Sequence, residues 1–153
     1  MSIKIALYKP EIPPNTGNIA RLCVAIGAEL HIVDKPSFDL SEKAVRRAGL
    51  DYWEYVSLHQ HKSWEDFIRN IDNSSRIFLI SKFGKAKYTE PRFQADDWFV
   101  FGQETKGLPK NIINNFPVEQ VLRIPMENES RSLNLSNAVA IVAYESLRQI
   151  NNW

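Results

Sequence analysis

Short apolar runs alternate with amphipathic segments along most of the chain. The runs rich in β-branched and aromatic residues predict strands at 3–8, 30–33, 55–58, 76–81, 98–101 and 121–124. Helical spacing and capping residues predict helices at 19–26, 42–48, 63–71, 109–115 and 136–151. Because the strands are apolar throughout and helices separate them, the pattern predicts an α/β fold with a mostly parallel sheet and helices on both faces.

Prolines and capping residues set the expected boundaries of the first and last helices. Pro10, Pro13 and Pro14 predict an extended connection after the first strand, with helix only from Ile19 onward. At the other end, Ser136 is the expected cap of the last helix.

Length and composition are typical of one soluble domain covering residues 1–153, without a repeat, a linker or an appended RNA-binding domain. The chain is 44% hydrophobic and 24% charged, with a formal net charge of +1. This balance does not indicate a nucleic-acid binder, although it can hide a local basic patch. No signal peptide or membrane-length apolar run is present, so we expect a cytoplasmic protein that does not enter a membrane.

Several common kinds of catalytic site are disfavoured by the sequence. Gly102 and Gly107 have P-loop spacing, but Leu108 and Pro109 follow where a P-loop needs Lys and Ser or Thr. The histidines lack zinc-site spacing, so we expect no metal and interpret His59 and His61 as exposed loop residues. The single cysteine, Cys23, lies in an apolar helical run and is interpreted as a small buried residue.

Polar residues instead follow three of the predicted strands, at 15–21, 101–108 and 124–138. The carboxyl ends of parallel strands share one rim, where α/β sheets bind ligands. Taken singly, the 101–108 stretch also fits an ordinary turn with Glu104 in solvent, and the other two fit helix caps. The first helix is so apolar that Arg21 has little polar face to occupy, and we expect it to reach into a cleft.

Taken together, the three polar stretches resemble the motifs of the SPOUT class of S-adenosylmethionine-dependent RNA methyltransferases. The first two motifs are Asn15-x-Gly17-Asn18-x-x-Arg21 and Phe101-Gly102-x-Glu104-x-x-Gly107-Leu108. The third is Ile124-Pro125-Met126 with Ser132-Leu133-Asn134-Leu135-Ser136. Their order and spacing agree with the class, and the resemblance covers essentially the whole chain.

The resemblance implies a C-terminal trefoil knot, S-adenosyl-L-methionine as methyl donor with S-adenosyl-L-homocysteine as product, and no metal. It implies catalytic roles for Arg21, Glu104, Asn15 and Asn134. It implies that the cofactor is bound by Ile80, Gly102, Ile124, Met126, Ser132 and Leu133. It also implies a homodimer with its sites near the subunit contact. Residues 138–144 and much of 19–26 are apolar all round and fit either a dimer contact or a central helix within one chain.

Further matches at 11–18, 46–52 and 130–138 resemble the short branch of the class, which 2'-O-methylates the wobble nucleotide of tRNA. The substrate tRNA would then contact Arg46, Arg47 and Lys82, and Tyr144 would lie at the substrate site or the dimer contact. Three alternatives stay open. The chain could methylate another RNA target, such as a ribose at another tRNA or rRNA site or a base nitrogen. It could be a module that binds RNA or cofactor without catalysis, or a doubly wound nucleotide enzyme.

Overall fold

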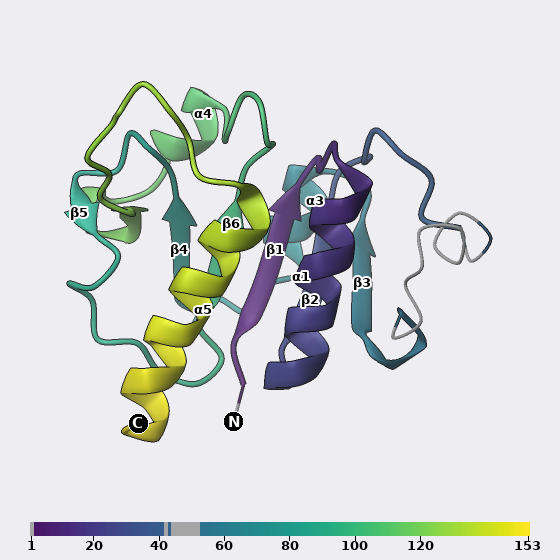
Figure 1. Cartoon of the computed structure of the whole chain (residues 1–153), viewed down its shortest axis with the longest axis horizontal. Helices are drawn as coiled ribbons and strands as arrows, with labels where there is room; N and C mark the ends of the chain where they lie inside the picture. Colours follow the sequence, from purple (N-terminus) through teal and green to yellow (C-terminus); the bar gives the residue numbers. More distant parts are fainter. Residues whose placement is uncertain (1, 42, 44–52) are drawn as a thin grey trace.

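The computed structural model describes residues 2–41, 43 and 53–153, and it contains a sheet of seven strands (Figure 1). The strands are β1 (Lys4–Tyr8), β2 (Glu29–Val33), β3 (Ser57–His61), β4 (Ile77–Ile80), β5 (Ala86–Lys87), β6 (Trp98–Phe101) and β7 (Val121–Arg123). They lie in the order β3-β2-β1-β6-β4-β7-β5, and all of these pairings are parallel. The predicted α/β class is confirmed. The predicted helix at 42–48, with Arg46 and Arg47, lies outside the described residues.

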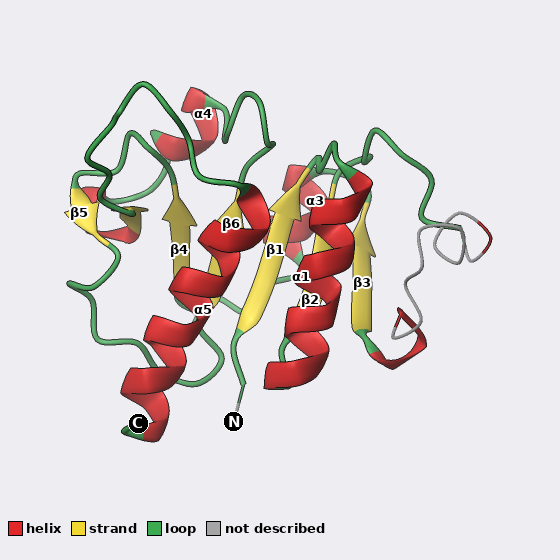
Figure 2. Ribbon diagram, viewed as in Figure 1, coloured by secondary structure: helices red, strands yellow, loops and turns green. Residues whose placement is uncertain are grey.

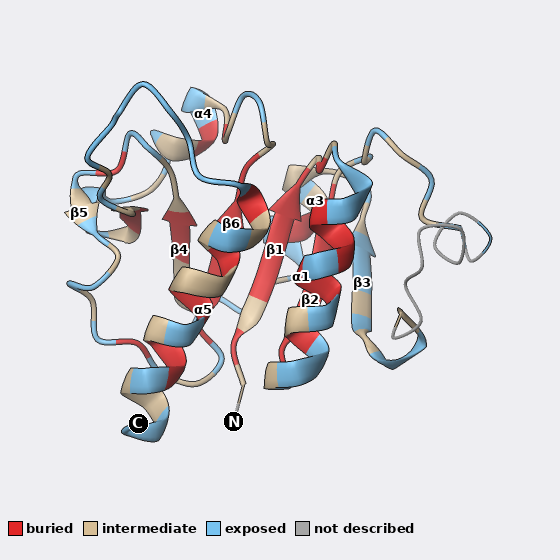
Figure 3. Cartoon of the chain, in the orientation of Figure 1, coloured by how far each residue is buried: buried red, intermediate tan, exposed pale blue. Residues whose placement is uncertain are grey.

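Helices cover both faces of the sheet. Helices α1 (Pro13–Ile26) and α5 (Leu135–Asn151) lie side by side over one face (Figure 1). Helices α3 (Trp64–Arg69) and α4 (Lys110–Ile113) pack on the other. Strands β1 and β6 are buried nearly along their whole length (Figure 3), since successive side chains enter the cores on opposite faces. This rigid centre fixes the loops at the carboxyl ends of its strands.

The first helix begins six residues earlier than the sequence pattern predicted. Pro13 and Pro14 occupy its first turn rather than an extended connection. A proline there loses no helical hydrogen bond, because the first amides of a helix have no partner within it. Gly27 ends α1 in the left-handed conformation, with φ of 70°.

Two strands at the sheet edges differ from the sequence prediction (Figure 2). Strand β3 is Ser57–His61 rather than 55–58, because its polar residues gave little hydrophobic signal. Strand β5 has only two residues and was not predicted. The interpretation of His59 and His61 as loop residues was therefore wrong, since both lie in β3.

Two buried groups are held in their neutral forms. Burial raises the pKa of the Cys23 thiol to about 12, which confirms the structural interpretation of this residue. On β2, burial lowers the pKa of His31 to about 4 despite its hydrogen bond to Glu29.

Among the described residues, no helix is long and apolar enough to cross a membrane.

Candidate functional site

A cavity lies at the carboxyl ends of β4, β6 and β7, between the loops that follow these strands and the start of α5. It contains all six residues that the resemblance assigned to the cofactor: Ile80, Gly102, Ile124, Met126, Ser132 and Leu133. Leu108, Leu135 and Ala138 add apolar surface. These residues, which come from three different loops and the start of α5, therefore share one cavity at this rim of the sheet.

The three polar stretches meet beside this cavity through a chain of side-chain contacts. The Nδ2 amide of Asn134 donates to Oδ1 of Asn15 at 2.9 Å, and Nδ2 of Asn15 lies 3.4 Å from Oε2 of Glu104. Asn15 is only 5% exposed, so its amide is fixed by these partners rather than by solvent. Residues separated by up to 119 positions are thus joined in one polar network.

Glu104 has a defined partner at the amino-terminal end of α1. Its carboxylate accepts hydrogen bonds from the backbone amides of Glu11 at 3.0 Å and Ile12 at 2.6 Å. These amides precede the helix, where negative charge is favoured. The expectation that Glu104 could lie free in solvent was wrong.

The segment before α1 also provides a carboxylate that binds the 103–107 loop. The Glu11 carboxylate accepts from the backbone amide of Thr105 at 3.1 Å and from its hydroxyl at 2.7 Å. These hydrogen bonds hold the pKa of Glu11 below its usual range. The 103–107 loop is therefore fixed to the start of α1 by carboxylates from both sides.

Two glycines allow this loop to fold tightly against itself. Gln103 and Gly107 exchange backbone hydrogen bonds of 3.3 and 3.0 Å, and Gly107 has φ of 65°. A Cβ atom on Gly102 would lie 2.2 Å from backbone atoms of Gly107 and Leu108. Gly102 is therefore required because the backbone passes too closely for any side chain.

Asn134, rather than the predicted Ser136, caps α5. Its Oδ1 accepts hydrogen bonds from the backbone amides of Ser136 at 2.9 Å and Asn137 at 3.3 Å. The helix begins at Leu135, so Ser136 lies in its first turn. One asparagine thus caps a helix with its oxygen and joins the site network with its nitrogen.

Replacing Asn134 by alanine is expected to lower the free energy of unfolding by about 0.5–2 kcal/mol, because the cap is lost. Asn134→Asp keeps the capping oxygen but cannot donate to Asn15, so we expect it to recover stability without recovering activity. Denaturant unfolding measures the first effect. Asn128→Ala, at an exposed loop asparagine whose oxygen accepts from the Ser130 amide, is the matched control. Equal stabilities of Asn134→Ala and wild type would contradict the capping role.

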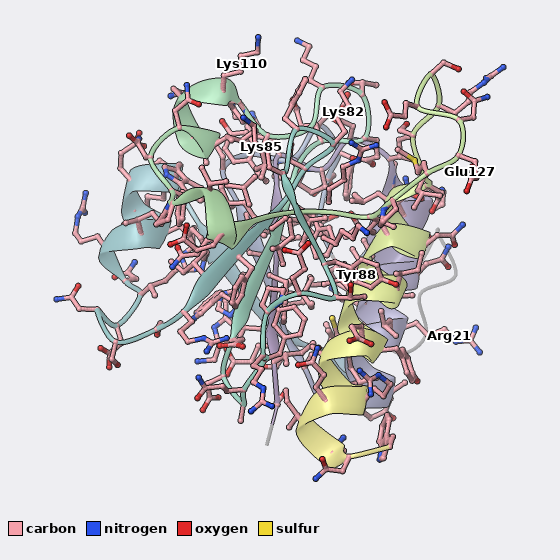
Figure 4. The ribbon with its side chains drawn as sticks, turned by 90° about the vertical axis from the view of Figure 1, so that its left-hand side faces the viewer. Arg21, Lys82, Lys85, Tyr88, Lys110 and Glu127 are labelled. Atoms are coloured by element: carbon pink, nitrogen blue, oxygen red, sulfur yellow. The ribbon has the colours of Figure 1, made fainter. Side chains whose placement is uncertain are left out.

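Arg21 lies on the outer side of α1 and projects away from the body of the chain (Figure 4). It is exposed and is not among the residues that line the cavity. The expectation that it enters a cleft of its own chain was wrong, because the apolar face of α1 that packs on the sheet leaves Arg21 on the opposite side. Tyr144 is likewise exposed, on α5, with its ring centroid 6.3 Å from that of Trp153.

Lysines gather at the cavity end of the molecule, where Figure 4 labels Lys82, Lys85 and Lys110. Lys82 lines the cavity together with Phe83, whose ring is 54% exposed. The ammonium groups of Lys82 and Lys110 lie 5.2 and 5.9 Å from the centroid of this ring. The sequence interpretation missed Phe83, although an apolar residue between lysines in a loop was a visible signal.

Comparisons with known proteins agree on one family. Residues 2–144 match the model described as the SpoU rRNA Methylase family. The chain is 45% identical to the tRNA (cytidine(34)-2'-O)-methyltransferase of Escherichia coli strain K12 over 148 residues, which are 97% of this chain and 94% of that protein.

Solved structures give the same result. One described as giving insights into the 2'-OH methylation of C/U34 on tRNA has a TM-score of 0.92 and 41% identity, covering 99% of this chain and 98% of that one. An AdoMet-bound rRNA methyltransferase from Sinorhizobium meliloti has a TM-score of 0.81 and 25% identity, covering 96% of this chain and 56% of that one.

Proposed function

The chain belongs to the SpoU rRNA methylase family, and on this premise we propose that it transfers a methyl group to the ribose 2'-hydroxyl of nucleotide 34 in tRNA. The observation that carries the proposal is the cavity at the carboxyl ends of β4, β6 and β7, which residues of the second and third motif stretches line. Asn15 of the first stretch joins the other two through the polar network beside this cavity. Identity of 45% over nearly the full length of a relative named for this reaction supports the choice of substrate.

S-adenosyl-L-methionine is the proposed methyl donor, and the cavity suits it in two ways. Apolar side chains of Ile80, Leu108 and Leu135 face a common space with room between them for a flat ring. The missing side chain of Gly102 lets backbone groups approach a ligand closely. When bound, the cofactor supplies a positively charged sulfonium whose methyl group is open to attack by an oxygen.

The chain's own polar residues must then orient the ribose and stabilise the charge that develops on its 2'-oxygen. We assign the charge stabilisation to Arg21, because a guanidinium is a permanently charged hydrogen-bond donor and suits an electrostatic role better than that of a general base. Glu104, Asn15 and Asn134 have the role of positioning the loops around the ribose, through the network that joins them. Donors fixed in advance lose no free energy to reorganisation during the reaction.

A homodimer reconciles the position of Arg21 with this role. Arg21 is exposed on the outer side of α1, and apolar residues lie on the same outer surface of α1 and α5, namely Val24 at 37% exposure and Tyr144 at 49%. We propose that two copies pack through these helices and that Arg21 of each copy serves the cavity of the other. The partly exposed Ile141 fits the same contact.

The tRNA is proposed to lie along the lysine-rich end of the molecule. Lys82 stands at the cavity mouth, with Phe83 beside it as an exposed ring on which a base can stack. Arg46 and Arg47 stay predicted contacts. One domain covering 1–153 contains all of these groups, and a cytoplasmic location fits a tRNA substrate.

The trefoil knot also stays a proposal, and the strand order supports it. In the sheet, β7 lies between β4 and β5, although β5 directly follows β4 in the sequence. The connection between them therefore crosses β7, where a Cβ atom on Gly84 would lie 2.6 Å from the carbonyl carbon of Leu122. A chain leaving β7 toward α5 beneath this connection would be threaded through it.

Mass spectrometry of tRNA nucleosides tests the proposed reaction. Cells without the gene should lack 2'-O-methylation at position 34 in at least one tRNA, and the wild-type gene should restore it. Purified protein should place a labelled methyl group on the same nucleotide of unmodified tRNA. An unchanged anticodon loop in the deletion strain, with methylation lost elsewhere, would instead favour another RNA site.

A further inference from the structure

A cluster of histidines and one glutamate lies at the edge of the sheet formed by β2 and β3, and β1 separates β2 from β6, the nearest strand of the cavity. Glu29 and His31 lie two residues apart on β2, and His59 and His61 lie two apart on β3. The parallel register places His31 opposite His59. Because side chains two apart on a strand share a face, all four point to the same side of the sheet.

The nitrogen and oxygen atoms of three of these side chains converge. Nε2 of His31 is 3.0 Å from Oε2 of Glu29, and Nε2 of His59 is 3.9 Å from the same oxygen. The potential ligand atoms of Glu29, His31 and His59 all lie within 4.8 Å of one another. In a tetrahedral zinc site neighbouring ligand atoms are roughly 3.3 Å apart, so the widest separation among these three groups needs to close by at most about 1.5 Å.

For the three ligand atoms to come closer together, at least one side chain must be able to move. His31 is fixed, whereas His59 is exposed. His31 is only 5% exposed and packs against Trp98, with ring centroids 4.5 Å apart, so it is fixed in place. The side chain of His59 is 48% exposed. Its ring now stacks on His31 at 4.5 Å, and a rotation about its side-chain bonds would turn a ring nitrogen toward the shared oxygen.

His61 contacts His31 on the side of the ring that faces away from Glu29. Its Nε2 lies 2.9 Å from Nδ1 of His31, the ring nitrogen that does not face Glu29. With a metal ion on Nε2, His31 carries its proton on Nδ1 and donates it to His61, which holds its own proton on Nδ1. Both rings stay neutral, so the change is one of tautomer and no proton leaves the pair. A partner of this kind orients the metal-bound imidazole.

We propose that Glu29, His31 and His59 bind a zinc ion, with His61 as the positioning residue for His31. Two imidazoles and a carboxylate are a donor set that zinc accepts, with water as a fourth ligand, whereas calcium and magnesium prefer oxygen alone. The bound ion would link β2 to the exposed edge strand β3. The site is independent of the methyl-transfer cavity.

Lys4 is the nearest cation to consider, because it pairs with Glu29 in the register of β1 and β2. Its ammonium group lies 5.2 Å from the centroid of the Trp98 ring, which gives it a second partner besides the Glu29 carboxylate. No zinc pattern in the sequence indicates this site, because such patterns are read along one segment, while these ligands come from two strands that only the fold brings together.

Titration of the chelator-treated full chain with zinc chloride tests the proposal, using calorimetry and the visible absorption of cobalt(II) as a substitute ion. We expect one ion per chain, intense cobalt bands typical of tetrahedral coordination, and a higher melting temperature with zinc. His59→Ala and Glu29→Gln, both at partly exposed side chains, should abolish all three signals. His61→Ala should weaken binding roughly 10–100-fold.

Gln60→Ala is the matched control, because Gln60 is exposed on β3 and faces the other side of the sheet. It should bind zinc like the wild type. Absence of binding by the wild-type chain, or equal binding by His59→Ala and wild type, would overturn the proposal. His59→Ala should methylate tRNA at the wild-type rate, so the proposed zinc site and the proposed reaction are tested separately.

Discussion

Arg21→Ala is expected to slow methyl transfer by about 10²–10³-fold while leaving the affinity for S-adenosyl-L-methionine unchanged. The guanidinium stabilises the negative charge that develops on the ribose oxygen, and this charge is absent when only the cofactor is bound. Single-turnover rates with labelled cofactor measure the first quantity, and calorimetry measures the second.

Arg69→Ala is the matched control for this variant. Arg69 is an exposed helical arginine on α3, on the other face of the sheet, with an ion-pair distance of 3.7 Å to Asp66. It should methylate at the wild-type rate. If Arg21→Ala also does so while still binding cofactor, the catalytic assignment of Arg21 is wrong.

Mixing two impaired variants at limiting cofactor tests whether Arg21 acts across the dimer contact. In a mixed dimer of Arg21→Ala and Gly102→Ala, one cavity is intact and the opposite chain supplies an intact Arg21. Random mixing in equal amounts should therefore restore about a quarter of the wild-type activity. If a verified mixed dimer recovers no methyl-transfer activity, Arg21 acts on the cavity of its own chain.

Gly102→Ala is expected to weaken cofactor binding by about 10–100-fold, with methyl transfer falling accordingly at limiting cofactor. Its new methyl group would lie 2.2 Å from the carbonyl carbon of Gly107 and the amide nitrogen of Leu108, so the 103–107 loop must move. Relieving overpacking of this kind costs about 1–3 kcal/mol. Calorimetry with S-adenosyl-L-homocysteine measures the loss.

The control for this variant is Gly27→Asn, at the left-handed end of α1, where a Cβ atom would have nothing within 4 Å. Asparagine tolerates this conformation, so cofactor binding should not change. Wild-type affinity in a folded Gly102→Ala chain would show that the tight loop does not form part of the cofactor site.

Much of the site could be predicted from the sequence because its parts follow strands. Polar residues after β1, β6 and β7 had to reach one rim in any parallel sheet, whatever the strand order. The six residues that the resemblance assigned to the cofactor line one cavity at that rim. The partners within the site could not be predicted, since the contact of Asn15 with Asn134 joins segments whose distance depends on the whole fold.

The wrong predictions came from places where local signals conflict with tertiary contacts. Pro13 and Pro14 were taken as helix breakers, yet the first turn of a helix accepts them. Strand β3 consists largely of polar residues and was placed too early, and β5 is held by pairing with β7 rather than by its own two residues. The surroundings of Arg21 depend on which face of α1 packs on the sheet. Because α1 is apolar on most sides, its sequence pattern did not show which face is buried.

The position of β7 between β4 and β5 has a consequence during synthesis. A ribosome releases the chain from its amino terminus, so β4 and β5 emerge before the strand that joins them. The cavity also lacks the wall formed by Ser132, Leu133 and Leu135 until the last part of the chain appears. A nascent chain therefore lacks this part of the cavity wall until residues 132–135 have been synthesised.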